Sequence, residues 1–110
     1  MVIDTSAIVA ILRNEPKRYD FDKLIQDDPV RLVSAVTRVE AAFVIEGRWG
    51  HAARSGLDRF FRLAELEIVS VTPDQAELAV DAFRRYGKGR HPAGLNIGDC
   101  FPYALAKSTG

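Results

Sequence analysis

Short apolar stretches alternate with helical patterns along this chain, and this alternation limits the fold more than any other feature. The pattern predicts three strands, over residues 1–4, 30–34 and 66–71. Apolar residues at helical spacing predict helices over residues 5–13, 17–27, 35–47, 52–65, 73–86 and 97–107. Strands that alternate with helices are typical of a parallel sheet covered by helices. We therefore predict an α/β fold with a small sheet of three parallel strands.

The composition agrees with one domain that has a hydrophobic core. The chain has 110 residues, of which 47% are apolar, and its 15 basic side chains balance its 15 acidic ones. No bulk charge therefore attracts nucleic acid or an anionic membrane, and any RNA contact must come from local patches. No apolar run approaches the roughly 18 residues of a transmembrane helix, and the first residues do not resemble a signal peptide. The single cysteine, Cys100, excludes an internal disulfide and favours a reducing compartment, which we take to be the cytoplasm.

Asp4 directly follows the first predicted strand and precedes the hydroxyl residues Thr5 and Ser6. In open α/β sheets, ligands bind beyond the carboxyl ends of the strands, which is where Asp4 is expected to lie. Two roles are open for this carboxylate. It can cap the helix that follows, since aspartate is a favoured N-cap residue. If Thr5 or Ser6 caps that helix instead, Asp4 is free to bind a cation or a substrate.

Glu40 stands in a strongly apolar stretch that is predicted to be a buried helix. Its distance from Thr37 matches a capping box, which is one interpretation. A helix that begins near Ser34 would instead place Glu40 inside the helix, on a largely apolar face. Charged side chains are rarely buried unless they are paired or bind a metal. We therefore favour a functional role for Glu40 over capping.

Asp99 lies near the start of the last predicted helix, again among apolar residues. The structural alternative is a favourable interaction with the helix dipole, worth a few tenths of a kcal/mol up to about 1 kcal/mol. Asn96 already offers a plausible N-cap for this helix. We therefore expect that Asp99 is not needed for capping. Pro102 is predicted to remove one backbone hydrogen bond and to kink the helix.

Taken together, these three carboxylates indicate a site for a hard cation. None of them has a basic neighbour in the sequence, and the chain has no cluster of cysteine or histidine. Carboxylate ligands without sulfur or imidazole favour Mg²⁺, or alternatively Mn²⁺, over zinc. Such ions characteristically serve phosphoryl chemistry, in which they lower the pKa of an attacking water and offset charge on the phosphate.

Three stretches, Val2–Ala7, Ser34–Glu46 and Leu95–Lys107, resemble in this order the PIN domain family. Within that family, the chain resembles the VapC-type toxins of bacterial toxin–antitoxin pairs. The resemblance covers essentially the whole chain. It implies a three-layer α/β/α sandwich with a small parallel sheet, binding of Mg²⁺ or Mn²⁺, and hydrolysis of RNA phosphodiester bonds by a metal-dependent endoribonuclease.

The resemblance also assigns roles to individual residues. By position, Asp4, Glu40 and Asp99 match the first, second and third acidic residues of the family, which are its catalytic and metal-binding positions. Ser6, or Thr5, matches the hydroxyl position that forms a hydrogen bond near the metal. A supporting role falls to Asn96, which often has a polar counterpart in related sequences.

The resemblance further implies partners. These are a cognate VapB-type antitoxin whose tail covers the acidic site, commonly with an arginine near the carboxylates, and a second copy of the chain in a homodimer. For the RNA substrate, the basic residues Arg13, Lys88 and Arg90 are candidate phosphate contacts, although ordinary solvation is the alternative for each of them. No membrane partner is expected.

One departure from the family pattern keeps other functions open. Family members usually carry a final strand, and often a fourth acidic residue, beyond the position of Gly110. We therefore expect a single PIN-like domain over residues 1–110 that lacks this strand.

A catalytically impaired PIN-like domain that binds protein or RNA is the main alternative. A phosphatase or receiver domain with Asp4 as phosphate acceptor is disfavoured, because such phosphatases carry a second aspartate two residues later, where this chain has Ser6.

Overall fold

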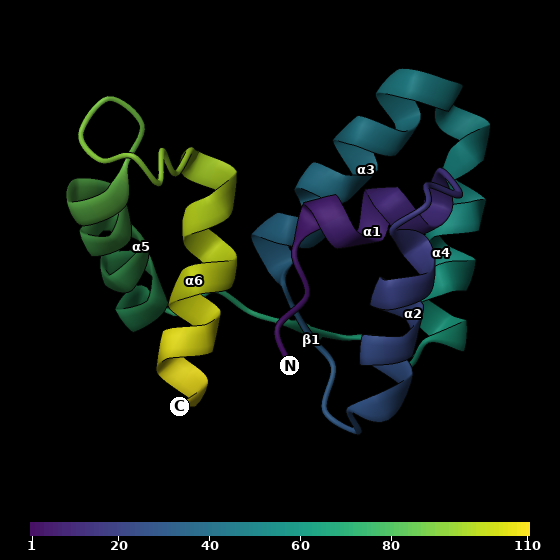
Figure 1. Cartoon of the computed structure of the whole chain (residues 1–110), viewed down its shortest axis with the longest axis horizontal. Coiled ribbons are helices and arrows are strands. Elements are labelled where there is room, and N and C mark those ends of the chain that lie inside the picture. The colour runs from purple at the N-terminus through teal and green to yellow at the C-terminus, as the bar shows by residue number, and fades with distance from the viewer.

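Six α-helices surround a sheet of two short parallel strands in the computed structural model, which describes residues 1–110 (Figure 1). The helices are α1 (Thr5–Leu12), α2 (Arg18–Asp27), α3 (Ala35–Trp49), the 3₁₀ helix η1 (His51–Ala53), α4 (Arg54–Leu63), α5 (Pro73–Tyr86) and α6 (Ile97–Thr109). The strands are β1 (Leu32–Ser34) and β2 (Glu67–Val69). The predicted α/β fold with a small parallel sheet is confirmed. None of the helices is both long and apolar enough to cross a membrane.

The strands are shorter than the sequence predicts. The first predicted strand forms only a parallel bridge from Val2 to Leu32, because Asp4 already acts as the N-cap of α1. β1 and β2 pair in parallel from Leu32↔Glu67 to Ser34↔Val69. Pairing stops there because Ser34 is the N-cap of α3, so the chain leaves the sheet and Ser70 finds no partner strand.

The helices follow the predicted pattern closely. Thr72 caps α5 by accepting a hydrogen bond from the Gln75 N–H at 3.1 Å, and Pro73 occupies the first helical position. The helix predicted over residues 52–65 is divided into η1 and α4, and α4 ends at Leu63. The end is set by Glu65, whose φ of 54° cannot continue a helix. Pro102 does not interrupt α6, which runs on to Thr109.

Buried side chains form two separate cores. The main core joins α1, α2, α3, α4 and the strands through Ile3, Ile8, Ile25, Val33, Ala41, Ala42, Leu57 and Phe61. A smaller cluster lies between α5 and α6 and consists of Ala79, Ala82, Cys100 and Ala104. We call it the hairpin core, because α5 and α6 lie side by side and are joined by residues 87–96 (Figure 1). The strands lie between this hairpin and the helices of the main core, which gives the expected layered arrangement.

Candidate active site

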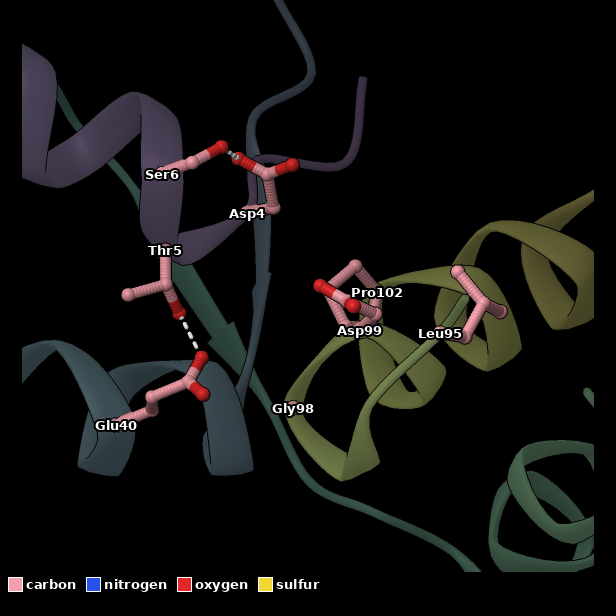
Figure 2. A pocket seen from close by; sticks show the side chains of 8 residues that line it. All are labelled: Asp4, Thr5, Ser6, Glu40, Leu95, Gly98, Asp99 and Pro102. Carbon is pink, nitrogen blue, oxygen red and sulfur yellow. Dashed lines mark hydrogen bonds between the residues drawn. The ribbon is translucent and has the colours of Figure 1, made fainter. Parts of the chain in front are cut away.

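The three predicted carboxylates face one cavity of about 220 Å³ (Figure 2). Asp4 comes from the start of α1, Glu40 from the middle of α3 and Asp99 from the first turn of α6. The structure thus brings together side chains that are separated by 36 and 59 positions in the sequence. The remaining lining residues are Thr5, Ser6, Leu95, Gly98 and Pro102.

Asp4 caps α1 and also lines the cavity. Its Oδ1 atom accepts hydrogen bonds from the Ala7 N–H at 3.0 Å and from the Ser6 hydroxyl at 2.8 Å. Asp4 is therefore the N-cap of α1, and the alternative that Thr5 or Ser6 caps this helix is wrong. The second oxygen, Oδ2, accepts no hydrogen bond. One carboxylate can cap a helix and still offer an oxygen to the cavity, because it has two acceptor atoms.

Glu40 lies inside α3, which begins after the N-cap Ser34, so the capping box with Thr37 is excluded. The Thr5 hydroxyl donates a short hydrogen bond to Oε1 of this half-buried carboxylate (Figure 2). This contact joins the first residue of α1 to α3 across the cavity. The hydrogen bond fixes the Glu40 side chain through Oε1. The second oxygen, Oε2, accepts no hydrogen bond.

Asp99 takes part in the cap of α6, contrary to the prediction. Its Oδ2 atom accepts a hydrogen bond from the Asn96 N–H at 3.0 Å, and the Asn96 side chain accepts one from the Asp99 N–H at 3.0 Å. This reciprocal capping box forms because Asp99 is the third residue of the helix, where its side chain reaches back to the cap. Oδ1 accepts no hydrogen bond. Asn96 does not line the cavity, so it supports the site through Asp99.

Gly98 is the lining residue that the sequence reasoning missed. It is buried, and a Cβ atom at this position would lie 2.7 Å from Cδ and 2.9 Å from Oε1 of Glu40, with Oε2 closer still. The first turn of α6 therefore lies directly against the Glu40 carboxylate. A signal was present in the sequence, because glycine is unfavourable inside a helix and this one immediately precedes Asp99.

The predicted RNA-contacting residues lie outside the cavity. Lys88 and Arg90 are exposed on the loop between α5 and α6 and form no ion pair. Arg13 follows the end of α1 and pairs with Glu15 at 3.2 Å. Of these three candidates, Lys88 and Arg90 are thus the two without an ion-pair partner.

The cavity offers the donors that a hard cation requires. All three carboxylates lack an ion-pair partner, and no basic side chain lines the cavity. No three acidic, histidine or cysteine side chains lie close enough to hold one ion jointly. Mg²⁺ usually keeps several water ligands and binds directly to one or two carboxylates. The residues therefore fit a hydrated Mg²⁺ ion better than a fully dehydrated one.

Comparisons with known proteins point to one family. The PIN domain model matches residues 1–110. A ribonuclease VapC of Mycolicibacterium smegmatis is 53% identical over 110 residues, which are 100% of this chain and 85% of that protein. Ribonuclease VapC30 of Mycobacterium tuberculosis is 49% identical over 110 residues, which cover 100% of this chain and 84% of the relative.

A solved structure has the same fold. The crystal structure of Mycobacterium tuberculosis VapC20, described as a sarcin–ricin loop cleaving toxin, superposes with a TM-score of 0.75 at 20% sequence identity. The match covers 99% of this chain and 82% of that protein. At this level of identity, the likeness shows the fold alone.

Proposed function

We propose a function from one premise: this chain belongs to the PIN domain family and, within it, to the VapC ribonucleases. The resemblance predicted from its residues is thereby confirmed. We infer that the chain is the endoribonuclease toxin of a toxin–antitoxin pair and hydrolyses RNA phosphodiester bonds with Mg²⁺, or Mn²⁺, held in the acidic cavity.

One observation supports the proposed metal site. Each of the three carboxylates accepts hydrogen bonds from the protein on one oxygen only, one bond for Glu40 and Asp99 and two for Asp4, and the other oxygen accepts none. The bonded oxygens fix the side chains, while Asp4 Oδ2, Glu40 Oε2 and Asp99 Oδ1 remain as acceptors. A cation is the natural complement of such a set, because no basic side chain of the chain lies in the cavity.

Each residue of the site has its own role in the proposed reaction. When bound, Mg²⁺ would lower the pKa of a water ligand and offset the charge that develops on the phosphate. Asp4 and Asp99 would hold the cation from the starts of α1 and α6. Glu40, fixed by Thr5, would bind it through water or orient the attacking water. Exposed Lys88 and Arg90 contact phosphates of the RNA backbone, which supplies most of the affinity in such complexes.

The same cavity suggests how the toxin is held inactive. A VapB-type antitoxin with an arginine at the carboxylates would form charge-assisted, bidentate hydrogen bonds there and displace the cation. We also propose that the chain acts in the cytoplasm and as a homodimer, as the resemblance to VapC toxins implies. Size-exclusion chromatography with light scattering tests the dimer directly.

Replacing Asp4 with asparagine is the sharpest test of the metal site. Asparagine caps helices about as well as aspartate, so Asp4→Asn should fold normally. It should nevertheless lose Mg²⁺ binding and at least about 100-fold in RNA cleavage, because metal sites lose 10- to 100-fold even when only a supporting partner is changed. Calorimetric Mg²⁺ titration and sequencing of cleaved RNA ends measure both.

The matched control is Glu77→Gln, which removes a carboxylate from an exposed position of α5. This variant should bind Mg²⁺ and cleave RNA like the native chain. Cleavage by Asp4→Asn at the native rate would refute the assignment of the active site.

A binding module without catalysis is the second candidate. It is favoured by the absence of any three acidic, histidine or cysteine side chains close enough to share one ion. Binding of RNA by the native chain without cleavage, at saturating Mg²⁺ and Mn²⁺, would support it over the nuclease.

A further inference from the structure

We propose that Gly98 is a positioning residue for the acidic site. Because it has no side chain, the first turn of α6 packs directly against the Glu40 carboxylate. This contact sets how far Asp99, the next residue of α6, lies from Asp4 and Glu40. Its effect on cation binding and cleavage rests on the proposed function, whereas the packing itself does not.

The lack of space for a side chain at Gly98 supports this proposal. The three atoms nearest to a Cβ at Gly98 all belong to the Glu40 carboxyl group, and two of them would lie at 2.7 and 2.9 Å. Non-bonded heavy atoms are most favourable about 3.5 to 4.0 Å apart. Even the smallest side chain therefore cannot enter unless Glu40 or α6 moves.

Glu40 cannot move away without losing a contact. Its Oε1 atom accepts the hydrogen bond from the Thr5 hydroxyl, so a rotation of the carboxylate breaks that bond and withdraws a charge from the cavity. If α6 moves instead, Asp99 moves with it and the cavity widens. Either response changes the arrangement of the three carboxylates.

The backbone gives no other reason for glycine at this position. Gly98 is the second residue of α6 and has a helical conformation. Alanine would favour the helix here if there were room for it, because it has the higher helix propensity. The close approach of helix and carboxylate is what requires glycine.

The first experiment replaces Gly98 with alanine and compares it with Gly47→Ala. Gly47 lies in α3, the helix of Glu40, and a Cβ there would meet no atom within 4 Å. We expect Gly98→Ala to lower the melting temperature and to weaken Mn²⁺ binding by about 10- to 100-fold, as changes to partners of metal ligands do. Gly47→Ala should bind Mn²⁺ like the native chain and melt no earlier. Electron paramagnetic resonance of free Mn²⁺ measures the affinity. The measurement is made below the melting temperature of each variant, so that every variant is folded.

The second experiment separates a contact with Glu40 from a general clash. The change Gly98→Ala is made in a Glu40→Ala background, where the side chain that fills the space is absent. The loss of melting temperature should be large in the native background and should vanish in the Glu40→Ala background. This comparison holds even if Gly98→Ala alone does not fold, because the double variant should then fold like Glu40→Ala.

Two results would overturn the proposal. One is an equal loss of stability in both backgrounds, which would place the clash elsewhere. The other is native Mn²⁺ affinity in folded Gly98→Ala. Failure of the proposed function looks different: the native chain would bind no Mn²⁺ and cleave no RNA, while the stability coupling between Gly98 and Glu40 would persist.

Discussion

The main core and the hairpin core hold their helices together with side chains of different size. The main core uses Ile, Leu, Val and Phe side chains from α1, α2, α4, β1 and the N-terminal segment, together with two alanines of α3. The hairpin core consists of three alanines and Cys100. Small residues at a helix contact let the two axes approach closely, since the interaxial distance depends on the side chains between them. The buried residues of the main core are therefore mostly large, and those of the hairpin core are small.

This difference bears on the active site, because the site is shared between the two parts. Asp4 and Glu40 project from helices of the main core, and Asp99 projects from the hairpin (Figure 2). A fault in the main core should disturb the whole molecule. A fault in the hairpin core should move mainly Asp99 relative to its two partners. Substitutions in each core test this difference.

The largest effect is expected from Leu57→Ala in the main core. Leu57 is fully buried in α4, so its truncation should cost about 2–5 kcal/mol in lost burial and in the cavity that remains. That is a large part of the roughly 5–15 kcal/mol by which a typical domain is stable. Urea unfolding measures the change. Leu63→Ala, in the same helix but 67% exposed, should change the stability by no more than about 0.5 kcal/mol.

A smaller effect is expected from Ala104→Leu in the hairpin core. Ala104 is fully buried between α5 and α6, and added volume there should cost about 1–3 kcal/mol by forcing the helices apart. Because Asp99 lies on the same helix, Mg²⁺ binding and RNA cleavage should also weaken. Ala106→Leu, on the exposed face of α6, is the control and should affect neither. If Ala104→Leu matched this control in stability, the hairpin would not be closely packed.

The sequence predicted the main features of the fold, because local signals decide them. Apolar spacing placed every helix to within a few residues, and the Thr72–Pro73 pair marked the start of α5 correctly. The strands were predicted too long. Their ends are set by Asp4 and Ser34, which begin helices, and the alternating pattern of apolar residues carries no information about where pairing stops.

The candidate site was predicted residue by residue, but its contacts were not. From the sequence, helix capping and cation binding were alternatives for Asp4, and Asp99 was not expected to take part in capping. Each carboxylate has two oxygens and can serve one role with each, which becomes visible only when the partners of both atoms are known. The bond from Thr5 to Glu40 and the space at Gly98 depend on the packing of α1, α3 and α6, which no local pattern encodes.

The smallest effect concerns the titration of Cys100, which reports how well the hairpin core excludes water. Burial, and to a lesser extent the negative charge of Asp99, raise the pKa of this thiol above its ordinary value of 9.0. The folded state therefore favours the protonated thiol. The resulting stability is fully present below the pKa of the unfolded chain and is lost as the pH rises through the folded pKa.

We therefore expect the native chain to lose more stability than Cys100→Ala as the pH rises above 9.0, the ordinary value for the thiol. Urea unfolding of both chains between neutral and alkaline pH measures this difference, in which the titration of the tyrosines cancels. The folded chain should also react slowly with a maleimide near neutral pH, because the thiolate is the reactive form. Rapid labelling without denaturant, or parallel stability curves for the two chains, would mean that water reaches the small-residue contact. The hairpin core would then exclude water less well than the main core. The distance of Asp99 from Asp4 and Glu40 would in that case depend more on the contact between Gly98 and Glu40 than on the packing of α5 against α6.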